Sequence, residues 1–282
     1  YLLLETCNLA KAFKDMDADI KLDATQALAD FYLSAGQTGD ALNYYKQMLT
    51  EALKAKTVPG RTAQIYTKIA ATQKALKDVA AADKTLLEAT KYLEKEAGKD
   101  SVSLIPIYLM IMQNTTEEKA LTDKINCIDS IVDNYKQEPI NLRSRIRDND
   151  ARIASNLLMS YSRNTKYRRH TDLVSAFQTS ISAQCARIGY KLKLKSEPRF
   201  DYFSFRQVID SMQDAGQYEQ AASLYKETIA MLESSSERSD KIHLEAIRNN
   251  YLKALELANK TSEAEKIKAE VKAKDESRLA DD

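Results

Sequence analysis

Two stretches of this chain, 180 positions apart, carry the same spacing of acidic, small and tyrosine residues. The first contains Asp30, Ala35-Gly36-Gln37, Ala41 and Tyr45-Lys46, and the second contains Asp210, Ala215-Gly216-Gln217, Ala221 and Tyr225-Lys226. Self-similarity of this kind is typical of proteins that stack one supersecondary unit many times. The recurrence therefore predicts a curved helical repeat protein, a scaffold that holds a partner.

The scarcity of turn-forming residues favours helices over strands. The chain of 282 residues has only 6 Gly and 4 Pro, whereas an all-β fold needs such residues every few positions. Breakers at Pro59-Gly60, Gly98, Pro139, Gly189 and Pro198 separate long stretches in which apolar residues recur at helical spacing. We expect an all-α fold of long helices joined by short loops.

The two best-defined units each combine two amphipathic helices around a glycine. The first consists of Leu28, Ala29, Tyr32, Gly36, Ala41, Leu42, Tyr45 and Leu49. The second consists of Phe205, Val208, Ile209, Met212, Gly216, Tyr218, Ala221, Tyr225 and Ile229. The spacings i, i+1 and i+4 belong to one helix face, and the glycine gives the backbone freedom to turn between the helices.

This pattern resembles the tetratricopeptide repeat (TPR) family, although Ile209 stands where the family has a small residue. Looser units are Ile69, Ala70, Ala82 and Leu86; Tyr108, Ile111, Ala120 and Ile128; and Leu252, Leu255, Ala264 and Val271. The resemblance implies a right-handed α-solenoid of about six helix-turn-helix repeats. The alanines at 41, 82 and 120 are 41 and 38 residues apart, more than the family's period of about 34, so we expect longer helices.

We expect a single superhelical domain over residues 1–282. Its expected parts are a partial helix at 1–16, repeats 1–3 at 17–138, an irregular basic repeat at 139–199, and the last two repeats with a polar C-terminal helix at 200–282. The longest apolar run, residues 104–112, contains Pro106 and is shorter than the roughly 20 residues of a membrane span. Because the chain begins at Tyr1 without a signal peptide, we interpret it as a piece of a longer protein.

Composition and motifs favour no catalytic, metal or cofactor chemistry. The two histidines, His170 and His243, fall in different repeats, and no HExxH, GxSxG or P-loop motif is present. Of the three cysteines, Cys185 paired with His170 is the only nucleophile–base alternative that we keep open. We expect no enzyme, no cofactor and no bound metal.

The strongest local signal is positive charge in the middle of the chain. Residues 143–199 hold 13 Lys and Arg but only four acids, a net charge of +9, whereas the whole chain is +1. Asn149, Arg152, Asn156 and Arg163 fall on one helical stripe, opposite Ile153, Leu157 and Tyr161. Arg forks bind carboxylate or phosphate, so this stripe is a candidate anion-binding wall; a solvated helix face is the alternative.

Basic residues continue beyond this stripe. Arg163, Lys166, Arg168, Arg169 and His170 are expected in a turn between helices, and Arg168 and Arg169 complete the candidate site. Nucleic acid is disfavoured as a partner because the overall charge is near neutral and few aromatic residues are interleaved. The strict alternation in residues 190–195 predicts a short extended segment. For the aromatic residues that follow, at positions 200, 202, 203 and 205, we expect core packing, with Tyr202 or Phe203 exposed in a groove as the alternative.

Two functional hypotheses remain. TPR proteins that grip a chaperone's C-terminal carboxylate place Lys and Asn on the first helix of a repeat, but here Asp23, Gln26, Asp30, Arg206 and Asp210 occupy such positions. The acids contradict that clamp. We expect a non-enzymatic scaffold that binds a protein or peptide, with an acidic segment as one option, on the concave surface. The alternative is the extracytoplasmic sensing domain of a bacterial membrane receptor, which gives a slight preference for the periplasm.

Overall fold

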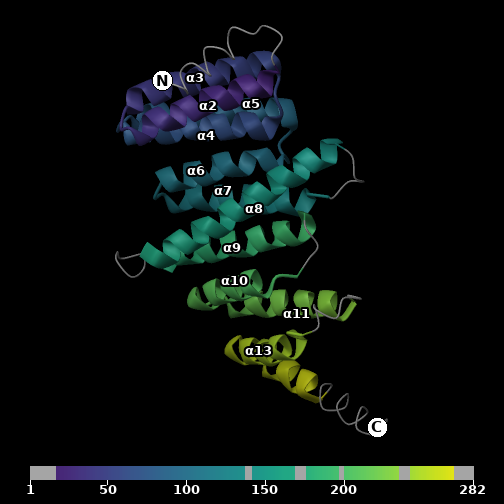
Figure 1. The fold of residues 1–282 in the computed structure, drawn as a ribbon. Coiled ribbons are helices and arrows are strands. Elements are labelled where there is room, and N and C mark those ends of the chain that lie inside the picture. The colour runs from purple at the N-terminus through teal and green to yellow at the C-terminus, as the bar shows by residue number, and fades with distance from the viewer. Residues whose placement is uncertain (1–16, 137–141, 169–175, 197–199, 235–241, 270–282) are drawn as a thin grey trace. The chain divides into compact units, whose positions relative to one another are not determined.

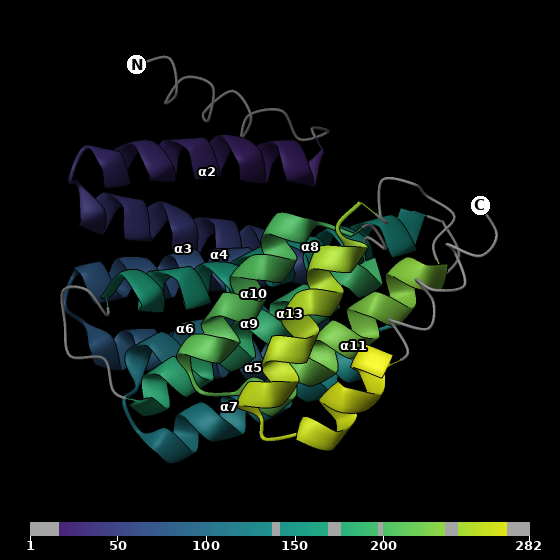
Figure 2. The same cartoon turned by 90° about the horizontal axis from the view of Figure 1, so that it is seen from below.

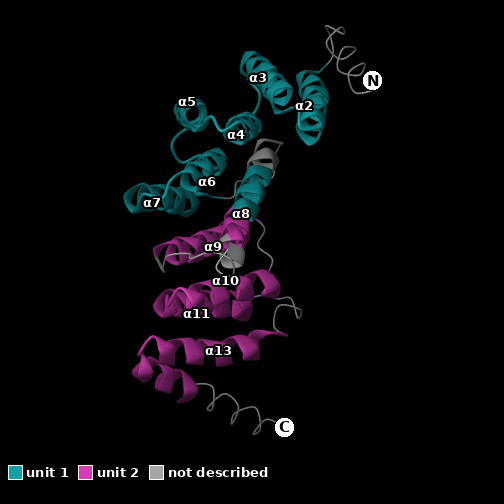
Figure 3. Cartoon of the chain, turned by 90° about the vertical axis from the view of Figure 1, so that its left-hand side faces the viewer, with its two compact units in different colours: residues 1–157 teal, residues 158–282 magenta. Residues whose placement is uncertain are grey.

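The computed structural model shows an all-helical chain (Figure 1). It describes residues 17–136, 142–168, 176–196, 200–234 and 242–269, and within these ranges there is no strand. The predicted all-α fold with a repeat-like packing of neighbouring helices is therefore confirmed. The chain divides into two compact units, residues 1–157 and residues 158–282 (Figure 3). The prediction of one superhelical domain stays a prediction.

Unit 1 is built from successive antiparallel helices. They are α2 (Ala18–Ser34), α3 (Thr38–Ala55), α4 (Pro59–Ala75), α5 (Val79–Ala97), the short 3-10 helix η1 (Val102–Leu104), α6 (Ile105–Asn114), α7 (Glu118–Asn134) and the first part of α8 (Leu142–Arg168). Helix α2 packs along α3, α3 along α4, and α4 along α5. Figure 2 shows α2 and α3 side by side. The pairs bury apolar stripes against each other, as the helical spacing predicts.

Unit 2 continues with the rest of α8, α9 (Ala176–Ser196), α10 (Tyr202–Asp214), α11 (Tyr218–Ser234), α13 (Leu244–Leu257) and a helix over residues 261–269. A series of aromatic rings runs through its core. Tyr190 of α9 lies 5.8 Å from Phe205 of α10, Phe205 lies 5.3 Å from Tyr225 of α11, and Tyr225 lies 6.3 Å from Tyr251 of α13, all between ring centroids. Phe205 is thus a core residue, as expected, whereas Phe203 is 75% exposed.

One turn geometry recurs between paired helices. The backbone is left-handed at Gly36, Lys77, Gly216 and Asn259, with φ of +77°, +64°, +69° and +58°. In each case the next N–H donates to the carbonyl five residues earlier, as from Gln37 to Tyr32 and from Gln217 to Met212, both at 2.9 Å. This is the Schellman arrangement that ends a helix. Four turns between paired helices share this geometry, two of them without glycine. The link from α3 to α4 has it as well, because Lys56 has φ +51° and the Thr57 N–H donates to the Ala52 carbonyl at 3.1 Å.

A buried alanine follows each of these turns five residues later. The four alanines are Ala41, Ala82, Ala221 and Ala264, and none is more than 1% exposed. A small residue at this position lets the two helices of a pair approach closely. The third expected repeat differs, because Ala120 is only half-buried and Leu121 lies in the core instead. In this repeat Thr115, which follows the last residue of α6, has an extended backbone with φ −123° and ψ 148°, so the turn from α6 to α7 has another form.

Tyrosine–carboxylate hydrogen bonds link helices within and between the pairs. The hydroxyl of the buried Tyr45 donates to Asp30, and Lys68 of α4 donates to the same carboxylate at 2.8 Å. Burial opposes ionisation of Asp30, but the bonds from Lys68 and Tyr45 outweigh it and lower the Asp30 pKa. Tyr108 and Tyr251 make similar bonds to acidic side chains, at 3.4 and 3.3 Å. The chain's many tyrosines therefore serve in part as packing residues with a polar end.

The half-buried Asp150 carboxylate of α8 packs against the start of α4 within unit 1. A Cβ placed on Gly60, in the first turn of α4, would lie 2.1 Å from both Asp150 oxygens. The Ser103 hydroxyl donates to the Asp150 Oδ2 at 3.3 Å. Burial raises the Asp150 pKa to about 6, although the Ser103 bond lowers it in part. Glycine is thus the residue that leaves room for this carboxylate.

Three local predictions for the basic region are wrong. Residues 190–195 are helical rather than extended, and Gly189 lies inside α9 rather than between helices. The alternating pattern misleads because α9 is buried around most of its circumference, including Ile181, Cys185, Ile188 and Leu192 as well as Tyr190. Helix α8 also continues to Arg168, so residues 163–168 lie in a helix and not in a turn.

Candidate functional site

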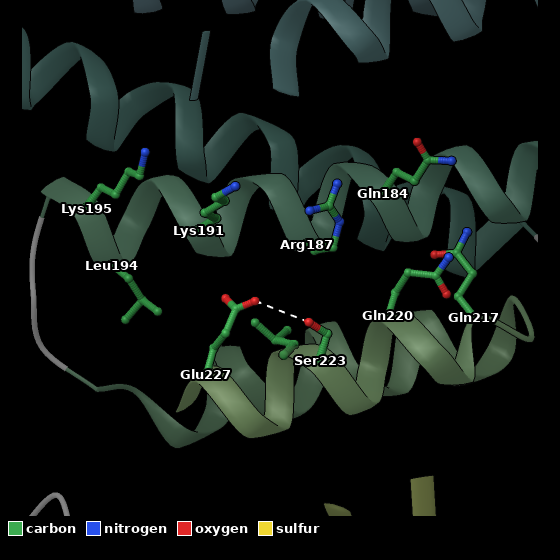
Figure 4. A pocket seen from close by; sticks show the side chains of 10 residues that line it. Gln184, Arg187, Lys191, Leu194, Lys195, Gln217, Gln220, Ser223 and Glu227 are labelled. Atoms are coloured by element: carbon green, nitrogen blue, oxygen red, sulfur yellow. Dashed lines mark hydrogen bonds between the residues drawn. The ribbon is translucent and has the colours of Figure 1, made fainter. Parts of the chain in front are cut away.

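A groove lies between α9 and α11 in unit 2 (Figure 4). Its volume is about 580 Å³. The residues that line it are Gln184, Arg187, Lys191, Leu194 and Lys195 of α9, Gln217 directly before α11, and Gln220, Ser223, Leu224 and Glu227 of α11. Both helices are the second members of their pairs.

The α9 side of the groove is basic. Arg187, Lys191 and Lys195 follow one another at four-residue intervals, which places them on one stripe of the helix. All three are half-buried. Figure 4 shows the three side chains in order along α9, while Leu194 points toward α11. We call these three residues the α9 cations.

Packing of neighbouring α9 residues in the core of unit 2 holds this stripe in place. Ala183, Ala186 and Tyr190 belong to the unit 2 core, and Ala183 and Tyr190 are fully buried there. Lys193, which lies between two of the α9 cations in sequence, has a structural role. Its ammonium donates to Asp201 Oδ2 at 2.7 Å and to the Ser204 hydroxyl at 3.1 Å. The end of α9 is thereby attached to the first turn of α10.

Asp201 is the N-cap of α10 and accepts from the Phe203 and Ser204 amides at 3.1 and 3.3 Å. Burial alone would raise its pKa, but the bonds from Lys193 and Ser204 dominate and lower the pKa to about 2. The ionised carboxylate is therefore retained in all but strong acid. This network orients the C-terminal part of α9, where Lys191 and Lys195 lie.

The α11 side is polar and carries one acid. Gln217 is fixed, because its side-chain amide donates to the Ser180 hydroxyl at 2.8 Å and to the Ser180 carbonyl at 3.3 Å. Gln220, Ser223 and Glu227 are exposed, and the Ser223 hydroxyl donates to Glu227 at 3.3 Å. Leu224 is buried and contributes apolar surface. The groove thus combines cations, hydrogen-bonding side chains and a small apolar area.

The residues proposed from sequence lie elsewhere, on α8. Asn149, Arg152 and Asn156 of unit 1 and Arg163 of unit 2 are all exposed. The Arg152 guanidinium donates to the Asn149 side-chain oxygen at 2.9 Å, so these two residues do lie together. Arg168 ends α8 but its side chain lies outside the described residues, as does the whole of Arg169. Their role in binding stays a prediction.

The residues opposite the charged stripe do not form the buried face of α8. Leu157 is 40% exposed, and Ile153 and Tyr161 are half-buried. The buried residues of α8 are instead Ala151, Ala154, Ser155, Leu158, Met159 and Ser162. Four of these six are alanine or serine, so a pattern of large apolar residues does not reveal this face.

The sequence contained a signal for the α9 cations that was missed. All three were counted within the basic segment, and their positions at i, i+4 and i+8 are those of one helix stripe. Because residues 190–195 were expected to be extended, Arg187 was not placed on the same helix as Lys191 and Lys195. The groove itself had no sequence signal, because its second wall comes from residues about thirty positions later.

Other chemistry has little support in the described residues. They contain no group of three or more His, Cys, Asp or Glu that could hold a metal ion, and no helix long and apolar enough to cross a membrane. Burial raises the pKa of the Cys185 thiol, which disfavours the nucleophilic thiolate. Its proposed partner His170 lies outside the described residues. No protein-family model matches the chain, and no curated protein is significantly similar to it.

Proposed function

We propose that this chain is a non-enzymatic binding scaffold, and that the groove between α9 and α11 holds an acidic segment of a partner protein. The observation that carries the proposal is the stripe of Arg187, Lys191 and Lys195 along one wall of a groove of about 580 Å³. The opposite wall supplies amide and hydroxyl groups suited to a peptide. Charge complementarity gives such a surface its specificity and its rate of association.

The scaffold itself is proposed to be a TPR-like, right-handed superhelix of about six helix pairs. The four Schellman turns between paired helices, each followed by a buried alanine, support this assignment. The proposed groove differs from the one expected from the family resemblance. It lies between the second helices of two successive pairs, whereas the peptide clamps of the family use the first helices.

The strength of binding can be bounded from the charges. Each exposed ion pair contributes about 0.2–1 kcal/mol, so three pairs supply at most about 3 kcal/mol, or a factor of about 100. The charges alone cannot sustain tight binding. Contacts with Leu194 and Leu224 must add to them, and we expect moderate affinity that weakens as salt is raised.

The test is a selection of displayed peptides on the purified chain. Peptides should be selected on the native protein and then measured against Arg187→Glu/Lys191→Glu in the groove. The matched control is Arg152→Ala/Arg163→Ala, which removes two cations from α8 instead. Circular dichroism and thermal unfolding verify that each variant is folded.

We expect selected peptides to be acidic, to lose binding to the groove variant and to retain binding to the α8 variant. Loss of binding in the α8 variant alone would move the site to α8, as the sequence first suggested. Selection of peptides without acidic residues, bound equally by all three proteins, would contradict the proposed function.

A further inference from the structure

We infer that a side of α2 left exposed by the described helices is a docking surface for residues 1–16 of the same chain, packed as a helix antiparallel to α2. Residues 1–16 lie outside the described residues, whereas the whole of α2 is described. The surface belongs to unit 1 and is separate from the groove in unit 2.

The exposed side of α2 carries four apolar residues at helical spacing. Ile20, Ala24, Ala27 and Phe31 follow one another at intervals of four, three and four residues, which places them on one stripe. Ile20 and Phe31 are 56% and 51% exposed, Ala27 is exposed and Ala24 is half-buried. The buried side of the helix, which includes Leu22, faces the other way. The described helices therefore cover only one of two apolar sides of α2.

The equivalent positions are covered in the other helix pairs that share the left-handed turn. Five residues before that turn, the first helices have Phe31 in α2 but Thr72, Ser211 and Ala254 in α4, α10 and α13, and the last three are at most 9% exposed. The positions twelve residues before the turn are buried in the same three helices, at Ile65, Ser204 and Ile247.

The preceding helix accounts for this burial. Helix α4 packs against α3, α10 against α9, and α13 against α11, so each first helix lies against the second helix of the pair before it. Helix α2 is the first helix that the structure describes. Its apolar stripe thus occupies the side on which a preceding helix stacks in a repeat protein.

Residues 2–13 have the intervals that such a helix needs. Leu2, Thr6, Leu9 and Phe13 are separated by four, three and four residues, and both stripes span eleven positions, or about 16 Å of helix. In an antiparallel arrangement each residue of one stripe lies beside one of the other, in the pairs Leu2–Phe31, Thr6–Ala27, Leu9–Ala24 and Phe13–Ile20. The pair with the smallest side chains, Thr6–Ala27, marks the closest approach.

The covalent connection favours residues 1–16 over a second copy of the chain. Residues 14–17 separate Phe13 from the start of α2, and a connection of this length is usual between antiparallel neighbouring helices. Asp17 already caps α2, because its carboxylate accepts from the Asp19 amide at 2.8 Å. A short connection gives the segment a high effective concentration at α2, which a separate chain does not have.

The first experiment places a disulfide at the closest pair. Thr6→Cys/Ala27→Cys is prepared in the full chain together with Cys7→Ser and Cys127→Ser, so that the remaining native cysteine is the buried Cys185. A disulfide requires two Cα atoms within about 7 Å. After mild oxidation, peptide mapping identifies the bonded pair, and non-reducing electrophoresis shows whether the bond lies within one chain or between two.

The matched control is Thr6→Cys/Lys91→Cys in the same background, because Lys91 is an exposed residue of another helix, α5. We expect a bond within one chain for the Thr6–Ala27 pair, formed at least tenfold faster than any bond in the control. Circular dichroism of the reduced proteins verifies that both variants are folded.

A second measurement needs no added cysteine. Phe31→Ala should lower Tm by roughly 4–8 °C, because it removes a side chain that residues 1–16 cover. Leu87→Ala is the control, since Leu87 of α5 is 54% exposed, and it should lower Tm by less than about 2 °C. Phe13→Ala should lower Tm in the same direction as Phe31→Ala, because it removes the other end of the same packed surface.

A bond within one chain, combined with a larger effect of Phe31→Ala than of Leu87→Ala, supports the docking of residues 1–16. A bond between two chains would show that a second copy covers α2 and would overturn the assignment. No bond faster than the control, or equal effects of Phe31→Ala and Leu87→Ala, would overturn it as well. None of these outcomes bears on the groove, so the proposed binding function stands or fails by its own test.

Discussion

Replacing Asp150 with asparagine should stabilise unit 1 at neutral pH and remove part of its pH dependence. The native carboxylate is enclosed by the start of α4 and by Ser103, and its pKa is raised to about 6 by burial. An unfolded aspartate ionises near pH 3.9. Folding therefore costs free energy whenever the pH is high enough for this group to be charged.

The direction and size of the change in stability follow from proton linkage. Between about pH 4 and pH 6 the unfolded state has lost the Asp150 proton while the folded state retains it, so stability falls as pH rises and is constant above that range. A shift of about 2 pKa units corresponds to ~3 kcal/mol at neutral pH. For a unit of this size, that is a rise in Tm of roughly 5–10 °C in the variant.

The assay is thermal and urea unfolding of Asp150→Asn and the native chain, followed by circular dichroism from pH 4 to pH 8. The difference in stability should be small at pH 4, where protonated Asp150 resembles asparagine, and should grow toward pH 7. Asp40→Asn removes an exposed carboxylate of α3 and serves as the control. A variant that is less stable than the native chain at pH 7, or a difference that does not change with pH, would refute this reasoning.

Three further predictions concern packing and capping. Gly60→Ala should destabilise unit 1 by about 1–3 kcal/mol, despite the better helix propensity of alanine, and much of that loss should disappear in an Asp150→Ala background when both are compared by urea unfolding. Lys193→Met should lower stability above pH 4 but make little difference near pH 2. The Asp201 pKa of about 2 means that the stabilisation from the Lys193–Asp201 ion pair is lost as pH falls from about 4 to 2. An equal loss of stability at both pH values would point to packing instead. Tyr45→Phe should cost about 1.5–3 kcal/mol in thermal unfolding through loss of a bond to a charged group, and a neutral effect would show that the hydroxyl bond contributes no net stability.

The repeat and its turns could be predicted because they depend on neighbours a few residues apart. Gly36 and Gly216 lie in the left-handed turn that their spacing indicated, and Ala41 and Ala221 are buried as expected. The turn at Lys77 was harder to recognise, because a lysine there has the left-handed backbone conformation that glycine normally adopts. Such a position carries no compositional signal.

The basic region shows where local patterns fail. Alternation in residues 190–195 predicted an extended segment, but they belong to α9. A helix buried around most of its circumference no longer needs an amphipathic pattern. Leu157 is exposed on α8 while Ala154 is buried, since close packing of helices favours small residues at the contact.

The sequence by itself determined that this chain is helical, where several of its helix pairs turn, and which small residues those turns require, because these properties arise from hydrogen bonds and contacts within about five residues. Only the tertiary structure decided which faces of α8 and α9 are buried and which cations line a groove. The groove has Arg187 on one helix and Gln220 on another, and no local pattern records that two distant stripes line the same space.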